Sequence, residues 1–88
     1  MSCTVRIPSP LRSYTAGAGS VTAEGATVAE VLASLEQRFG GIRFRVVDEQ
    51  SRVRPHIRFY VNTREVKALS DPVTHGDVVH VICALSGG

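Results

Sequence analysis

A single amphipathic helix is the feature of this 88-residue sequence that most restricts its fold. Thr27 and Glu30 have the spacing of a capping box, in which both side chains bond backbone N–H groups at a helix start. Apolar residues then recur on one helical face: Val28, Val31, Leu32, Leu35 and Phe39. Gly40 follows as an expected left-handed stop. One helix cannot bury its own apolar stripe, so the other segments are expected to form a sheet that covers it.

The segments around the helix alternate between apolar and polar residues with the two-residue period of strands. The predicted strands cover residues 3–7, 20–23, 57–61, 66–67 and 78–84. Residues 62–65 are a predicted turn, whereas residues 42–47 suit either a short irregular helix or an extended stretch. The last strand is almost continuously apolar, which is typical of a central strand covered on both faces.

These elements predict an α+β domain over residues 1–84, with one main helix packed across a mixed sheet of four to five strands. The first and last strands are the most apolar, so we expect them side by side and parallel in the middle of the sheet. Residues 85–88 are predicted to form a flexible tail beyond the domain. A chain of this length has room for one core and no second domain.

Composition narrows the class of protein. The net charge of +2 is too small to indicate nucleic-acid binding by itself. No apolar run approaches the roughly 20 residues of a membrane span, and residues 1–7 lack the pattern of a signal peptide. We therefore expect a cytoplasmic protein without a membrane or nucleic-acid partner. Cys3 and Cys83 lie in predicted strands, where a free thiol packs as a small apolar group, although the position of Cys83 near the end leaves a redox or acyl-transfer role open.

Basic residues are concentrated between residues 41 and 67, where the sequence has seven arginine or lysine residues and three acidic residues. Nucleic-acid binding would need one contiguous patch with exposed aromatic rings. Strand alternation should instead spread the charges, and Phe59 is expected in the core. The pattern therefore favours a solvated surface or a docking surface for an acidic enzyme rim.

The sequence has no recognisable catalytic or metal-binding constellation. His56, His75 and His80 lack zinc-ligand spacing with cysteine or with each other. The serines have no nucleophile-elbow motif, and residues 17–19 have no phosphate-loop context. We expect no catalytic residue, no metal site and no permanently bound cofactor.

The last five residues, Ala84-Leu85-Ser86-Gly87-Gly88, carry the clearest chemical signal. Two terminal glycines would arise from average composition in fewer than about 1% of chains. Five extended residues reach roughly 16 Å, and glycines can enter a channel too narrow for any side chain. An enzyme can adenylate the Gly88 carboxylate with ATP, and sulfide or another nucleophile can then attack it. A tail without a function is the alternative.

Several stretches carry a wider resemblance: Val5-Arg6-Ile7-Pro8 with Leu11-Arg12, residues 25–32, Tyr60-Val61-Asn62, residues 75–81 and Gly87-Gly88. Together they resemble the β-grasp, ubiquitin-like sulfur-carrier family. This family includes the molybdopterin synthase small subunit and the sulfur carriers of thiamine and cysteine pathways. The opening Ile-Pro and Leu-Arg pairs are most similar to the cysteine-pathway type, whereas Ala84-Leu85-Ser86 departs from the family's usual Pro-Ala-x.

The resemblance implies that Gly88 is adenylated, converted to a thiocarboxylate and used as a sulfide donor in the biosynthesis of cysteine, molybdopterin, thiamine or another metabolite. Gly87, Ser86 and Leu85 would give the chain end access to its enzymes. The implied partners are a ubiquitin-activating-type adenylyltransferase that uses ATP and Mg²⁺, a sulfur-accepting enzyme and, where a longer chain is trimmed, a zinc peptidase. The chain would then be a carrier and not an enzyme.

Two other functions are compatible with the same tail. In a protein modifier, a target lysine would attack the adenylated Gly88 carboxylate. In a non-covalent small subunit, the tail would only plug a partner's cleft. Lys67 is the only lysine of the chain, so lysine-linked chains of this protein are not expected.

Overall fold

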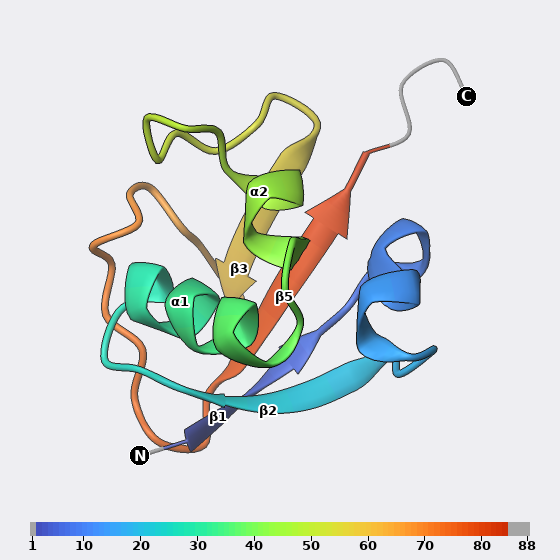
Figure 1. Cartoon of the computed structure of the whole chain (residues 1–88). Helices are drawn as coiled ribbons and strands as arrows, with labels where there is room; N and C mark the ends of the chain where they lie inside the picture. Colours follow the sequence, from blue (N-terminus) through green and yellow to red (C-terminus); the bar gives the residue numbers. More distant parts are fainter. Residues whose placement is uncertain (1, 85–88) are drawn as a thin grey trace.

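The computed structural model describes residues 2–84, which form a five-stranded sheet with both α-helices on one face (Figure 1). The elements are β1 (Ser2–Arg6), η1 (Ser9–Thr15, a 3₁₀ helix), β2 (Ser20–Glu24), α1 (Val28–Arg38), α2 (Ile42–Val46), β3 (Ile57–Val61), β4 (Arg64–Glu65) and β5 (Val78–Cys83). The strand order is β2-β1-β5-β3-β4. β1 and β5 are parallel, and the other neighbours are antiparallel. The predicted α+β architecture and its parallel central pair are confirmed.

α1 starts where the capping box predicts. Thr27 Oγ1 accepts a hydrogen bond from Glu30 N at 3.2 Å. Glu30 Oε1 accepts one from Ala26 N at 2.8 Å, one residue earlier than in the standard motif. Gly25 has a φ of 155°, and a Cβ there would lie 2.7 Å from Val31 N, so this turn requires glycine. The buried residues of the helix are those of the predicted stripe: Val28, Val31, Leu32 and Leu35.

The junction between α1 and α2 corrects the prediction for the helix end. Gly41, and not Gly40, has the left-handed backbone, with a φ of 98°. The Glu36 carboxylate accepts hydrogen bonds from Gly41 N at 2.8 Å and Arg43 N at 2.9 Å, and these bonds lower the pKa of Glu36. They also satisfy free N–H groups at the start of α2. Residues 42–46 are therefore helical, which decides between the two conformations that the sequence left open.

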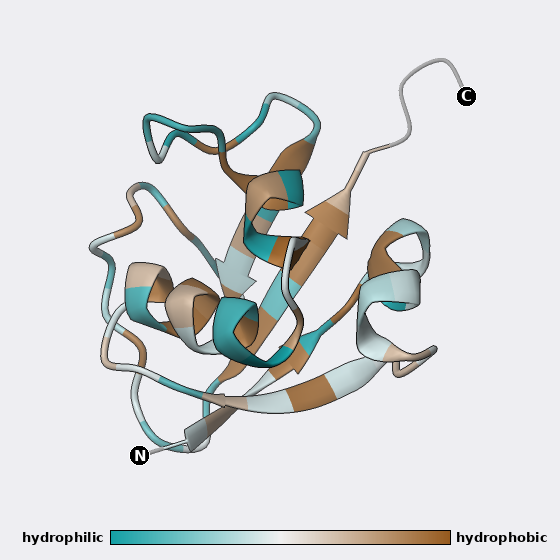
Figure 2. Ribbon diagram, viewed as in Figure 1, coloured by the Kyte–Doolittle hydropathy of each residue, from teal (hydrophilic) through white to brown (hydrophobic). Residues whose placement is uncertain are grey.

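The core lies between the helices and the inner face of the sheet, where apolar segments of both layers meet (Figure 2). Phe59 is buried there, as expected. Val47 and Val73, which lie outside the helices and strands, complete the core and tie two loops to the domain. Within residues 2–84, none of the helices has the length and apolar character needed to cross a membrane.

The outer face of β5 differs from its prediction. The strand is central, but α1 and α2 cover only one of its faces (Figure 1). Val79 and Val81 are buried, whereas His80 is half-buried and Ile82 is 44% exposed. The prediction that both faces are covered was wrong, because apolar composition alone does not say whether a second layer of helices exists.

The β3–β4 hairpin is also tighter than predicted. Its turn consists of Asn62 and Thr63, since Val61 pairs with Arg64. Asn62 takes the positive φ of 56° that a two-residue turn requires. β4 therefore covers residues 64–65 instead of 66–67.

Candidate functional site

The predicted site residues lie outside the described part of the chain: Leu85, Ser86, Gly87 and Gly88. Their geometry stays a prediction. The structure describes the surface from which they continue, at the end of β5. Ala84 N donates a hydrogen bond to His56 O at 2.8 Å and ties this end of the strand to the chain before β3. The surface around this bond is the candidate site.

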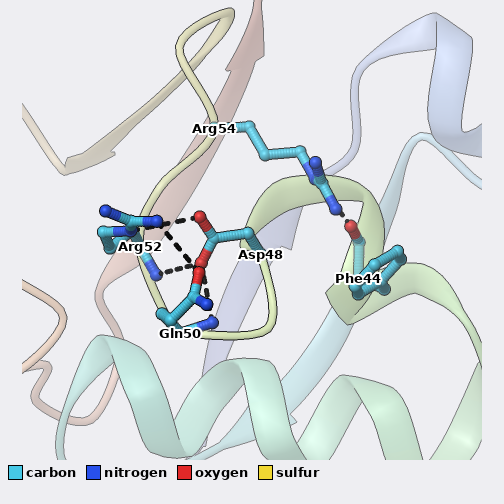
Figure 3. A network of polar contacts seen from close by, with 5 residues as sticks. All are labelled: Phe44, Asp48, Gln50, Arg52 and Arg54. Atoms are coloured by element: carbon cyan, nitrogen blue, oxygen red, sulfur yellow. Dashed lines mark hydrogen bonds and ion pairs between the residues drawn. The ribbon is translucent and has the colours of Figure 1, made fainter.

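On the helix side of the strand end lies a hollow of about 360 Å³, which we call the helix-side hollow. Its lining residues are Leu11, Phe44, Arg45, Arg54, His56 and Cys83. Phe44 is 51% exposed, and the Arg54 guanidinium lies 4.6 Å from the centroid of its ring. Arg54 Nε also donates to Phe44 O at 2.8 Å (Figure 3). An exposed aromatic ring held beside a cation is typical of a protein contact surface.

The loop before Arg54 is held in place by one carboxylate (Figure 3). Asp48 Oδ1 accepts hydrogen bonds from Gln50 N and Arg52 N, both at 2.9 Å. These bonds, chiefly the one from Arg52 N, lower the pKa of Asp48. Arg54 N then donates to Val46 O at 3.0 Å and closes the loop onto α2. The loop thereby fixes the backbone from which the Arg54 side chain reaches the hollow.

On the other side of the strand end lies a second hollow, of about 400 Å³, which we call the edge-side hollow. Its lining residues are Arg6, Ile7, Pro8, Ser9, Arg12, His80, Val81, Ile82 and Cys83. Arg12 Nε donates to Ile7 O at 3.0 Å, so its side chain is anchored along the edge of the hollow. The parallel register sets Arg6 beside His80.

The two hollows share Cys83 and the same kind of charge. Among the described residues, each is lined by two arginines and one histidine and by no acidic side chain. Arg45 and Arg54 come from the basic segment noted in the sequence, but Arg6 and Arg12 come from the first strand and η1. Charge of one sign around the end of β5 attracts and orients partners of opposite charge.

Comparison with known proteins identifies the domain. Residues 5–88 match the sequence profile of the ThiS family. The chain belongs to this family. The sulfur carrier protein CysO of Mycobacterium tuberculosis (strain ATCC 25618 / H37Rv) is 37% identical over 93 residues, which cover 100% of both chains.

Further relatives confirm the β-grasp, ubiquitin-like fold of this ThiS-family chain. A crystal structure of an Amycolatopsis orientalis BexX/CysO complex contains a chain that superposes with a TM-score of 0.91 at 39% identity, covering 98% of this chain and 99% of that one. Small archaeal modifier protein 3 of Haloferax volcanii is 38% identical over 68 residues, which cover 74% of this chain and 73% of the relative.

Sequence patterns did not mark Phe44 and Ile82 as surface residues of this ThiS-family domain. Phe44 lies two positions after Ile42 and two before Val46, both of which are buried, so a helical period places it on the opposite face of α2. That signal became usable only once residues 42–46 were known to be helical. For Ile82 no local signal existed, because its exposure follows from the bare outer face of the sheet.

The two cysteines have different surroundings. Cys3 is buried, and burial, with a smaller contribution from the Asp77 charge, raises the pKa of its thiol. Cys83 is half-buried and lines both hollows. Within residues 2–84, no three histidine, cysteine or acidic side chains are grouped so that they could hold a metal ion.

Proposed function

We propose that this ThiS-family chain is a sulfur carrier protein, and that the Gly88 carboxylate is the group that carries sulfur. The observation that carries the proposal is the Gly87-Gly88 pair in the four residues that follow a β-grasp domain of this family. Relatives that bear the name sulfur carrier protein support it across the whole length of the chain. If the natural chain continues beyond Gly88, a peptidase such as a zinc enzyme would have to expose this carboxylate.

The chemistry needs an activating enzyme, because a carboxylate is a poor electrophile. A Gly88 carboxylate oxygen attacks the α-phosphorus of ATP, pyrophosphate leaves, and an acyl adenylate forms. A sulfide nucleophile then attacks the carbonyl carbon, and AMP leaves with the C–O bond electrons. The product is a thiocarboxylate with the same charge as the starting carboxylate. ATP and Mg²⁺ belong to the enzyme, and this chain contributes the reacting group.

The surface at the end of β5 suits a chain that supplies the reacting carboxylate to a separate activating enzyme. The four residues from Leu85 to Gly88 span at most roughly 13 Å, so the enzyme must approach the end of β5 closely to reach Gly88. The enzyme therefore contacts the region of the two hollows. Their arginines favour an acidic rim around its active-site channel. A second enzyme that accepts the sulfur would use the same approach in turn.

Intact-mass spectrometry tests the proposal. The full chain is incubated with the adenylyltransferase of its own organism, MgATP and a sulfide source. We expect a gain of about 16 Da, because one oxygen of the terminal carboxylate is replaced by sulfur. A chain lacking Gly87 and Gly88 should show no gain, whereas Thr63→Ala, in the distant β3–β4 turn, should retain it. If protein isolated from its native host and the reconstituted mixture both lack this species, the carrier function is wrong.

Protein modification is the second candidate, because one relative is named a small archaeal modifier protein. The activation step would be the same, but a target lysine amine would displace AMP and form an isopeptide. Conjugates of higher mass that survive reducing denaturation, and that disappear without Gly87 and Gly88, would favour this function. A non-covalent subunit would instead tolerate Gly88→Ala without loss of pathway flux.

A further inference from the structure

The ladder between β1 and β5 stops before β5 does. The parallel register pairs Thr4 with Val78 and ends with Arg6 beside His80. On its other side, β5 stays paired with β3 up to Cys83. The last three residues of β5 therefore have a neighbouring strand on one edge only.

Pro8 is the reason for this early stop. In a parallel ladder, one residue bonds to the two residues that flank its partner, as when Thr4 N donates to Asp77 O at 3.0 Å. Every second residue along β1 bonds to β5 in this way, so Pro8 is the next residue after Thr4 and Arg6. Pro8 has no N–H to donate to Val81 O. The Pro8 carbonyl accepts from Leu11 N at 2.9 Å at the start of η1, and it receives no hydrogen bond from Cys83 N.

The unpaired edge consists of specific backbone groups. Successive residues of a strand point their N–H and C=O groups to opposite edges. Ala84 N bonds toward β3, to His56 O, so the backbone groups of Cys83 point toward β1. Within residues 2–84, Cys83 N–H, Cys83 C=O and Val81 C=O have no backbone partner on that edge. Val81 and Cys83, which carry these groups, both line the edge-side hollow.

We propose that an extended segment of the activating enzyme pairs with this edge of β5, from Val81 to Cys83, and places an acidic side chain between Arg6 and Arg12. An unpaired strand edge is a template for an added strand, and main-chain bonds of this kind give affinity without demanding a particular sequence. The identity of the partner rests on the proposed function. The unpaired edge and the charge beside it are features of the structure and do not depend on that function.

Charge decides which kind of occupant fits. The edge-side hollow holds Arg6, Arg12 and His80 and, among the described residues, no acidic side chain. A second copy of this chain would bring the same arginines against one another, which disfavours pairing between two copies. An acidic segment instead forms charge-assisted contacts with both arginines. The residues from Ala84 to Gly88 span at most roughly 16 Å, so an enzyme paired with this edge would already lie within reach of Gly88.

Hydrogen exchange of individual amides tests this pairing. In the full-length chain alone, we expect Cys83 N–H to exchange rapidly and Ala84 N–H, which bonds to His56 O, to exchange slowly. Addition of the adenylyltransferase without ATP should slow Cys83 exchange at least tenfold. The Cys83 amide could instead exchange more slowly as the concentration of this chain alone is raised. That result would assign the edge to a second copy and overturn the proposal.

A pair of matched variants supplies the second readout. Arg6→Gln should raise the KM for this chain in adenylation about threefold to tenfold, because it removes one cation from the hollow. Arg58→Gln, an exposed arginine on the other side of β5, should change the KM less than twofold. Equal effects of both substitutions would contradict the assigned position of the acidic segment.

The outcomes separate the two proposals. Thiocarboxylate formation with unchanged Cys83 exchange overturns the strand pairing and leaves the sulfur-carrier function intact. Slowed Cys83 exchange without any thiocarboxylate supports the pairing and overturns the carrier function. Absence of both overturns both.

Discussion

The two ends of β5 differ in how far their polar groups are hydrogen-bonded within the domain. At its start, Asn62 Nδ2 donates to Asp77 Oδ1 and Val78 N donates to Asn62 Oδ1, both at 3.0 Å. Thr74 N adds a hydrogen bond to Asp77 Oδ2 at 2.9 Å. The hydrogen bond from Thr74 N, and after it the one from Asn62 Nδ2, lowers the pKa of Asp77. Three segments of the chain are thereby joined where the last strand begins.

At its end, the same strand keeps backbone groups unpaired on one edge and exposes apolar side chains nearby. Phe44 and Ile82 are 51% and 44% exposed, respectively, and each lines one of the two hollows. A polar group that is paired inside its own domain stabilises that domain, whereas one left open can serve a partner. The contrast indicates that the start of β5 serves stability and its end serves recognition.

The largest expected effect is at the start of the strand. Asn62→Ala removes two side-chain hydrogen bonds and places alanine, which tolerates the left-handed region less well than asparagine, at a φ of 56°. The free energy of unfolding should therefore fall by about 1–3 kcal/mol. Thr63→Ala in the same turn should cost less than about 0.5 kcal/mol. Urea titration monitored by circular dichroism measures both. Similar losses for the two variants would mean that the Asn62 side chain has no special role.

A smaller effect is expected from a substitution near the end of β5, and it should weaken binding to the activating enzyme without changing stability. Phe44→Ala should leave the unfolding midpoint nearly unchanged, because the residue is 51% exposed. It should raise the KM for this chain in the adenylation assay about threefold to tenfold, as loss of an aromatic contact does. Val53→Ala, which also removes exposed apolar surface, is the control, since Val53 lines neither hollow. A large loss of stability without a change in KM would assign Phe44 to the core after all.

The smallest expected effect is a pH dependence at the start of β5. The folded-state pKa of Asp77 is lowered, so its contribution to stability is present above the unfolded-state pKa of about 4 and is lost as the pH falls through the folded value. The stability difference between wild type and Asp77→Asn should therefore shrink between pH 6 and pH 3. Thermal unfolding across this range measures it, with Thr63→Ala as a variant that changes no titrating group. A constant difference would contradict the assignment.

Local patterns were sufficient for much of the fold. The capping box of Thr27 and Glu30 located the start of α1, and two-residue alternation located β1, β2 and β3 within one residue. These signals depend on residues close in sequence, whose hydrogen bonding and burial repeat with a regular period. The Gly87-Gly88 pair could also be recognised from the sequence alone, since a chain end without side chains is defined by residue identity and not by contacts.

Features that depend on contacts between distant segments could not be predicted from such local patterns. Gly41 became the left-handed residue because Glu36 reaches forward to cap α2. The exposure of Ile82 depends on which face the helices cover. The open edge of β5 depends on a register that brings Pro8 opposite the strand's end. A residue's neighbours in the chain do not specify its partner across a sheet, so only the assembled fold joins Arg6, Arg12 and Cys83 into one hollow.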